Sequence, residues 1–354
     1  MTAKYAGTGS KSLSFSSAWM ELSDDGTASL SKEARGVALD LQMDADGVVS
    51  ATLDGLSAIY SDFATGGAIS LSGSAKLAAD FTPYAGYYTV VLPSEIEDVT
   101  GTGYIMLKFT SSSSVSKGKV GFSGLLPNGQ SISGTSYLSL DPDEAGYALL
   151  PVFRRTSKCL FSALLRIQAN GASLYADDET VRVVLADEDV APYFRCTQNG
   201  VGFEGTLGAY GGWYPMKTTV SEWLEIFEEQ THPFTLAFVV PAAGVKSELH
   251  GTLVEVPTAM VAADARKNLV IAKKEGYATI SFNKTSGLFS GKAKMVFEDG
   301  KTVSGTYKGL LTPGWLDCGC GDDRAVLPFG SGTLYYSDKV DGVTVKKSIA
   351  VELQ

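Results

Sequence analysis

The sequence VSKGKVGFSGLLPNGQSISGT occupies residues 115–135 and is typical of a β-hairpin. Its centre, Asn128-Gly129, is a dipeptide that favours a two-residue turn with positive φ between antiparallel strands. A related sequence, GLFSGKAKMVFEDGKTVSGT, returns at residues 287–306 with Asp299-Gly300 at its centre. In both copies a Gly-Thr pair begins five residues after the turn glycine. The chain is therefore predicted to contain two related hairpins.

Further features repeat in the same order on either side of residues 170–180. The matched pairs are Asp46-Gly47-Val48 with Asn199-Gly200-Val201, residues 87–93 with 235–241, Gly103-Tyr104 with Gly276-Tyr277, the two hairpins, and Leu150-Pro151 with Leu327-Pro328. Turn glycines and strand-end prolines are backbone requirements, so they survive the divergence of surface residues. We interpret the order as an internal duplication. It predicts two tandem, diverged, antiparallel β-barrel or β-sandwich halves, residues 1–172 and 173–354, in an all-β fold.

Strand patterns fill both halves, and one helix interrupts them. GYYTVVLP, residues 86–93, is apolar on both faces and predicts a strand covered on both sides. GVALDLQM, residues 36–43, alternates and predicts a half-buried strand. TVSEWLEIFEE, residues 219–229, has apolar residues on one helical face, so we expect one short amphipathic helix near 219–230. Residues 259–266 are compatible with one short helical turn.

Composition and net charge argue against several classes of binding partner. The 354 residues carry a net charge of −10, which disfavours nucleic acid and anionic membrane surfaces. The longest apolar stretch, residues 234–245, is too short to span a bilayer, so we expect no membrane insertion. No apolar segment follows Met1 in the manner of a signal peptide. We interpret the sequence as part of a longer secreted chain rather than as a cytosolic protein.

The four cysteines are too few and too unevenly spaced to predict a disulfide scaffold. Cys318-Gly319-Cys320 reads as a glycine-rich loop with two free thiols. A zinc ion there would need two further ligands. The only histidines, His232 and His250, lie in no nucleophile motif and are expected at the surface.

The motifs described above resemble modules repeated in very large surface or secreted proteins of anaerobic bacteria related to Verrucomicrobia and Lentisphaerae. The resemblance rests on GYYTVVLP, the strand entered by Gly103-Tyr104, the hairpin of residues 115–135 and the strand containing Leu150-Pro151. It covers residues 36–167 well and 200–336 more loosely. It implies a β-rich architecture and an extracellular or cell-surface location, and it brings no catalytic residues. The helix near 219–230 and the loop of Cys318 and Cys320 depart from the module.

An aromatic platform is the first candidate site. Tyr210, Trp213 and Tyr214 fall within five residues of a glycine-rich segment that we expect to be a loop. Aromatic faces stack on the apolar face of a sugar ring, so these three residues are candidates for glycan binding. The alternative is that they belong to the core, as strand aromatics usually do.

Carboxylates provide the second candidate site. Asp317, Asp322 and Asp323 flank the loop of Cys318 and Cys320 and offer oxygen ligands, so Ca²⁺ is the one cofactor that the sequence leaves open. Acidic turns are also commonly just solvated. A pair of carboxylates set across a sugar would be needed for glycoside hydrolysis, and sequence spacing does not identify one.

The sequence thus favours a non-enzymatic structural or adhesive module of a bacterial surface or secreted protein. The alternative is a carbohydrate-binding module that uses the aromatic platform, and a further alternative is a glycan hydrolase with paired carboxylates. The expected partners are a glycan, a cell-surface protein or neighbouring modules of a longer chain.

Overall fold

The structure is a computed structural model of the chain. It describes residues 2–4, 12–14, 23–44, 48–55, 69–74, 80–94, 96, 99, 101–141, 144–156, 159–169, 182–185, 191–198, 201–214, 234–240, 244–247, 249–256, 258–263, 269–271, 278–312 and 330–354. These residues form antiparallel sheets almost throughout, which confirms the all-β prediction. The boundary expected within residues 170–180 and the helix expected near 219–230 lie outside the described residues.

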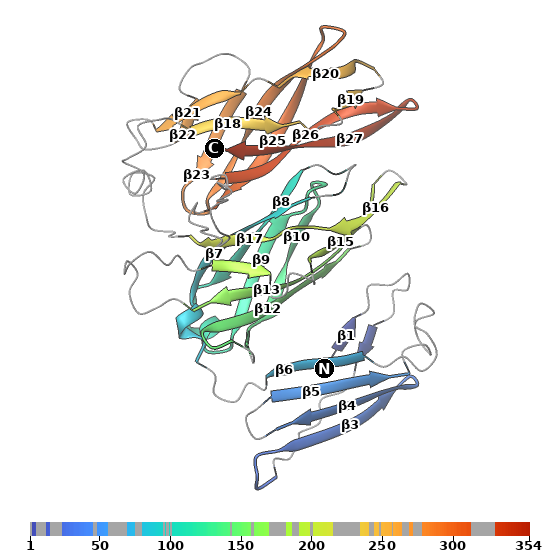
Figure 1. The fold of residues 1–354 in the computed structure, drawn as a ribbon, viewed down its shortest axis with the longest axis vertical. Coiled ribbons are helices and arrows are strands. Elements are labelled where there is room, and N and C mark those ends of the chain that lie inside the picture. The colour runs from blue at the N-terminus through green and yellow to red at the C-terminus, as the bar shows by residue number, and fades with distance from the viewer. Residues whose placement is uncertain are drawn as a thin grey trace, which may run out of the picture. The chain divides into compact units, whose positions relative to one another are not determined.

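The chain divides into two compact units, and the first comprises residues 1–80 and 139–149. Its main sheet is a four-stranded antiparallel meander of β3 (Ala28–Ala34), β4 (Val37–Met43), β5 (Val48–Asp54) and β6 (Ile69–Ser74) (Figure 1). Val37 and Leu39 are fully buried on one face of β4, as the alternation in that stretch predicts. The short strands β1 (Thr2–Lys4) and β2 (Ser12–Ser14) pair with each other.

The second unit comprises residues 81–138 and 150–354 and contains two sheets. The first of them follows the order β10-β9-β8-β7-β17-β14-β13-β12, with β15 paired to β13 and β16 paired to β15. Its strands are β7 (Gly86–Pro93), β8 (Thr102–Phe109), β9 (Lys119–Leu125), β10 (Ser131–Tyr137), β12 (Tyr147–Arg155), β13 (Cys159–Gln168), β14 (Arg182–Leu185), β15 (Tyr193–Gln198), β16 (Val201–Thr206) and β17 (Tyr210–Trp213). The short β11 (Ser139–Leu140) pairs with the start of β12, in a segment that belongs to the first unit.

The central strand of this sheet is β7, and residues 87–92 are all buried. The prediction that GYYTVVLP is covered on both sides is therefore confirmed. Strands β14 and β17 complete the sheet from beyond residue 172. The division of the chain into residues 1–172 and 173–354 stays a prediction.

The second sheet of the second unit curls into a half-barrel (Figure 1). Its order is β19-β20-β24-β25-β26-β27-β18-β21-β22, with β23 also paired to β24. Its strands are β18 (Phe234–Val239), β19 (Lys246–Ser247), β20 (Gly251–Glu255), β21 (Ala259–Ala263), β22 (Leu269–Ile271), β23 (Ala278–Asn283), β24 (Leu288–Phe297), β25 (Thr302–Leu311), β26 (Gly330–Val340) and β27 (Val343–Leu353). The curl brings β22 next to β23, and the concave face encloses Phe289, Phe297, Tyr307, Leu334 and Ile349.

The helical turn considered for residues 259–266 does not form over residues 259–263, because Ala259–Ala263 form β21; residues 264–266 lie outside the described residues. This strand lies between β18 and β22, and the Val261 side chain is fully buried in the core. The packing of the half-barrel therefore overrides the local preference of an alanine-rich segment.

The two predicted hairpins, β9–β10 and β24–β25, share one turn geometry. In each, the turn glycine donates its amide to the residue three positions earlier: Gly129 to Leu126 O at 2.8 Å, and Gly300 to Phe297 O at 2.9 Å. Only the glycine has positive φ, +83° at Gly129 and +74° at Gly300. The loop is thus a type I turn followed by a left-handed glycine, a three-residue connection rather than the two-residue turn expected from Asn-Gly and Asp-Gly.

The side chain before each turn glycine explains this choice. Asn128 Oδ1 accepts the Gln130 amide at 3.1 Å, and Asp299 Oδ1 accepts the Lys301 amide at 2.9 Å. Such bonds let Asn and Asp close a turn with their own side chains. The shared geometry agrees with the predicted relation between the two stretches.

Two tyrosines of the first sheet enter the core of the half-barrel. The Tyr87 hydroxyl donates to Ser286 O at 3.1 Å, and the Tyr214 hydroxyl donates to Lys284 O at 2.7 Å. Both acceptors lie in the β23–β24 turn, and the two rings meet edge to face with 5.9 Å between their centroids. Nearby, the Thr333 hydroxyl donates to Thr102 O at 2.8 Å. The two sheets of the second unit are therefore joined by hydrogen bonds as well as by apolar contact.

Candidate functional site

The segment YGGWY is a strand and not the loop that its glycines predicted. Residues Tyr210–Trp213 form β17, which pairs with β7 on one side and β14 on the other. A Cβ atom on Gly211 would lie 2.0 Å from Thr89 O. Glycine is therefore needed here for the close approach of two strands, rather than for flexibility.

The three aromatic residues of the predicted glycan platform have different surroundings. Tyr214 is 1% exposed, because its ring lies in the core beside Tyr87. Tyr210 and Trp213 are half-buried, and the Trp213 ring lies against Gly86. The structure does not bring the three rings together as one exposed surface. Tyr214 is enclosed and instead holds the two sheets together.

The carboxylates proposed as calcium ligands, Asp317, Asp322 and Asp323, lie outside the described residues, as do Cys318 and Cys320. A calcium site there stays a prediction. In the part of the chain that the structure describes, no three or more His, Cys, Asp or Glu residues are grouped so that they could hold a metal ion.

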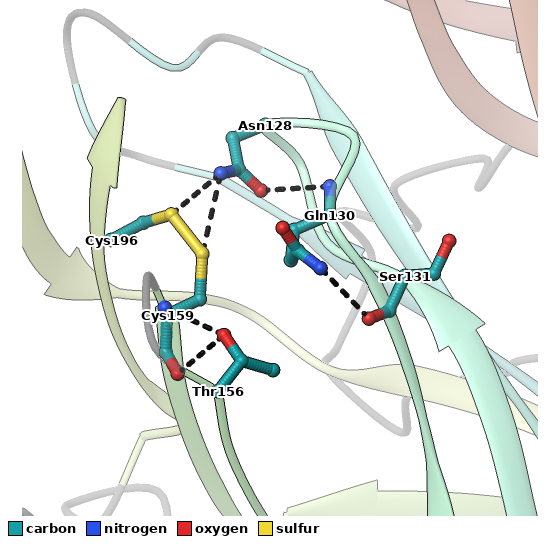
Figure 2. Close-up of a disulfide and its surroundings, with 6 residues drawn as sticks. All are labelled: Asn128, Gln130, Ser131, Thr156, Cys159 and Cys196. Atoms are coloured by element: carbon teal, nitrogen blue, oxygen red, sulfur yellow. Dashed lines mark hydrogen bonds between the residues drawn. A yellow bond between two sulfur atoms is a disulfide. The ribbon is translucent and has the colours of Figure 1, made fainter. Parts of the chain in front are cut away.

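Cys159 and Cys196 form a disulfide, which the spacing of the cysteines in the sequence did not predict (Figure 2). Cys159 begins β13 and Cys196 lies in β15, and the two residues are directly opposite each other in the antiparallel register. Their Cα atoms are 4.1 Å apart. The cysteine count argues against a disulfide scaffold and does not predict this single disulfide. The disulfide depends on the register of two strands whose cysteines are 37 residues apart in the sequence.

The β9–β10 turn lies beside this disulfide (Figure 2). The Asn128 amide nitrogen is 2.7 Å from Cys196 Sγ and 3.6 Å from Cys159 Sγ. Thr156 closes the other side, since its hydroxyl accepts the Cys159 amide at 2.9 Å. Gly129, the next residue after Asn128, packs against Tyr335 and Lys346 of the half-barrel. One turn thus contacts both the disulfide and the second sheet.

A buried ion pair links β19, β26 and β27. Asp338 is 4% exposed, and its carboxylate lies 2.9 Å from the Lys347 ammonium. The Ser247 hydroxyl donates to the same carboxylate at 2.6 Å, and the Lys339 amide donates at 2.8 Å. Burial raises the pKa of Asp338, but these hydrogen bonds and the charge of Lys347 outweigh it, so the pKa lies below its ordinary value. Lys347 also donates to Lys246 O.

His250, which follows Ser247 closely in the sequence, forms a second polar pair with Asp299. His250 Nδ1 is 2.8 Å from Asp299 Oδ2, and Lys301 is 3.9 Å from the same oxygen. The hydrogen bond from His250 is the largest cause that lowers the pKa of Asp299. The His250 ring also lies beside Phe297. The pair therefore fastens the β19–β20 turn to the β24–β25 turn.

A nucleophilic triad consists of a serine, a histidine and an aspartate, and this region contains Ser247, His250, Asp299 and Asp338. The Ser247 hydroxyl donates to Asp338, whereas the His250 imidazole binds Asp299. Ser247 Oγ also accepts the amides of Leu249 and His250, each at 3.2 Å. A triad needs the imidazole to take the proton of the serine hydroxyl. The described hydrogen bonds instead form two separate structural pairs.

The sequence contained a signal for one of these missed features. Asn199-Gly200 lies between YFRCTQ and VGFEGT, and a turn dipeptide between two such runs predicts the hairpin β15–β16. That hairpin places Cys196 in a strand. The partner Cys159 and the ion pair of Asp338 with Lys347 depend on tertiary packing, which leaves no local pattern in the sequence.

In comparisons with protein-family models, curated proteins and solved structures, no match to this chain was found. Within the described residues, no helix has the length and apolar composition that crossing a membrane requires.

Proposed function

We propose that this chain is a non-catalytic structural or adhesive module of a bacterial surface or secreted protein. The observation that carries the proposal is the disulfide of Cys159 and Cys196, whose cysteines face each other on neighbouring strands. Disulfides persist in oxidising environments such as the periplasm, the cell surface and the extracellular medium, and they are rare in the cytosol. The resemblance to repeated surface modules supports the same location.

The way in which the polar clusters are used also supports a structural role. Among the described residues, Ser247 and His250 form hydrogen bonds to different aspartates, Asp338 and Asp299. The hydroxyls of Tyr87 and Tyr214 donate hydrogen bonds to backbone carbonyls of the β23–β24 turn, and these bonds link the two sheets. Each cluster connects strands that lie far apart in the sequence, which resists unfolding.

Location and oxidation state test the proposal together. Antibodies raised against the chain are expected to label intact, unpermeabilised cells of its source bacterium, or its secreted material. Digestion of protein recovered from that source, without reduction, is expected to give one linked peptide pair containing Cys159 and Cys196. A Cys196→Ser variant provides the control in which that pair is absent. Recovery only from the cytosol, with both thiols free, would overturn the proposal.

A further inference from the structure

The outward-facing side of β23, β24 and β25 in the half-barrel carries mainly polar side chains, with Leu288 and Val296 at the two ends of β24. Side chains alternate along these strands, so one set points into the core and the other points to solvent. The solvent set of β25 is exposed from Thr302 to Lys308 at every second position. On β23 the solvent set is Thr279, Ser281 and Asn283, all exposed.

Three exposed lysines stand on this face among hydroxyl side chains. Lys292 lies between Thr279 and Thr306 in the register of the three strands. Lys294 is opposite Ser304, and Lys308 is opposite Ser290. Lys292 and Lys294 are two residues apart on one strand, which is about 7 Å, and neighbouring strands are about 4.8 Å apart. The three ammonium groups thus rise from one continuous patch, which we call the lysine face.

Within β23, β24 and β25 no acid lies on the lysine face, and the nearest acid in the register is Glu255 of β20, opposite Val296 at its edge. Residues 278–312 contain five lysines and two acids, a net charge of +3 in a chain whose total is −10. Both acids, Glu298 and Asp299, lie in the β24–β25 turn rather than on the face. None of Lys292, Lys294 and Lys308 forms an ion pair with a described residue.

The electrostatics beside the lysine face are consistent with uncompensated positive charge. Lys346 on β27 stands over the Tyr335 ring, 4.2 Å from its centroid. Burial, and then the charge of Lys308, lower the pKa of Lys346. An anion bound at the face would relieve this repulsion between the two lysines.

We propose that the lysine face binds a carboxylated polysaccharide. The inference rests on the proposed adhesive function and names its partner. Lysine is a compact charge on a flexible stem, which suits the neutralisation of a polymer better than the two-point recognition typical of arginine. A uronic acid unit carries a carboxylate beside ring hydroxyls. The face offers the matching arrangement, because each lysine stands next to serine or threonine hydroxyls in the register.

Nucleic acid is the competing polyanion. The net charge of −10 opposes both polymers, so the choice between them rests on the hydroxyl groups beside the lysines. A polysaccharide with one carboxylate per sugar has hydroxyl groups that can donate to and accept from Ser304 and Thr306.

Binding of polygalacturonate to the intact chain tests the proposal, with dextran as the uncharged polymer and duplex DNA as the competing one. We expect binding to polygalacturonate that weakens as salt is added, and none to dextran. Lys292→Glu and Lys308→Glu are each expected to weaken binding about five-fold or more, because a basic residue at an anionic surface contributes roughly that factor.

Lys32→Glu on β3 is the control, since it makes the same charge change at a half-buried residue of the other compact unit. We expect it to leave binding unchanged. The salt dependence of the native chain provides a readout that needs no variant. No binding to polygalacturonate at low salt, equal loss in all three variants, or tighter binding to DNA would each overturn the proposal. If the protein is nevertheless found at the cell surface, only this binding face is refuted and the structural role remains.

Discussion

Asp338 shows how a single buried charge can be retained in an apolar half-barrel. Its carboxylate receives hydrogen bonds from Ser247 and the Lys339 amide, and it pairs with the Lys347 ammonium. An unpaired buried carboxylate is strongly destabilising, whereas one with several donors is tolerated. The three donors come from β19, β26 and β27, so the charge fixes the relative register of these strands.

Replacement of this carboxylate is expected to change the pH dependence of stability. The pKa of Asp338 is lowered in the folded state, so its contribution is fully present above the unfolded pKa of about 3.9 and is lost as the pH falls through the folded value. Asp338→Asn should therefore lower the free energy of unfolding by about 2–3 kcal/mol at pH 7, and by less near pH 2.

Urea denaturation at the two pH values measures this difference. Asp299→Asn, at the surface pair with His250, is the comparison and should have a smaller effect at pH 7. An equal loss at both pH values for Asp338→Asn would mean that packing, rather than charge, accounts for its contribution.

Among the strands, the two related hairpins offer a controlled comparison. Gly129 and Gly300 occupy the same position of the same turn, with φ of +83° and +74°. Their surroundings differ, because a Cβ on Gly129 would lie 2.7 Å from Lys346 Nζ and 3.0 Å from the Tyr335 ring, whereas a Cβ on Gly300 meets nothing within 4 Å. A side chain would therefore strain the backbone at both Gly129 and Gly300. Only at Gly129 would it also clash with neighbouring side chains.

Alanine substitution should separate the two costs. Gly300→Ala is expected to destabilise the protein by about 1 kcal/mol, because alanine is strained at positive φ. Gly129→Ala is expected to cost about 2 kcal/mol or more, because its methyl group also displaces side chains of the half-barrel. Thermal and urea unfolding of both variants measure the difference. Equal losses would show that the β9–β10 turn does not pack against the second sheet in solution.

The strand patterns and the hairpins could be predicted from local sequence, because alternation and turn dipeptides are local properties. The glycines of β17 misled the prediction, since Gly211 can be required either by a flexible loop or by close strand contact. The sequence does not distinguish these causes without the neighbouring strand. The disulfide and the lysine face were missed for a similar reason. Cys159 and Cys196, or Lys292 and Lys308, become neighbours only through the register of the sheets.

In the second unit, several tyrosines lie between the two sheets and contact both of them. Tyr87 and Tyr214 bind the β23–β24 turn, and Tyr104 and Tyr335 share a smaller apolar cluster with Leu125 and Leu310. Burial raises the pKa of Tyr87 and of Tyr104 to about 12, and the neighbouring tyrosine adds to the effect at Tyr87. Ionisation of these hydroxyls is therefore coupled to the separation of the sheets.

Unfolding at high pH is expected to follow from this coupling. Tyrosine is neutral below its pKa, so the stability gained from the raised values is present below the unfolded pKa of about 10 and is lost as the pH rises toward 12. Tryptophan fluorescence and tyrosinate absorbance should change together in that interval. Tyr104→Phe, which cannot ionise, should move the midpoint to higher pH. Complete tyrosine ionisation near pH 10 with an intact fold would contradict this prediction.

The division of the chain into compact units has a consequence for how it can be cut. Because the first unit is built from residues 1–80 and 139–149, the backbone passes between the units three times. Cleavage at any one crossing leaves the two bodies tethered by the others. A truncation that begins at residue 81 removes residues 1–80 of the first unit. It keeps residues 139–149, which also belong to the first unit, between two sequence segments of the second unit. Domain dissection of this protein therefore requires excision of the 139–149 segment as well, with the ends at 138 and 150 rejoined.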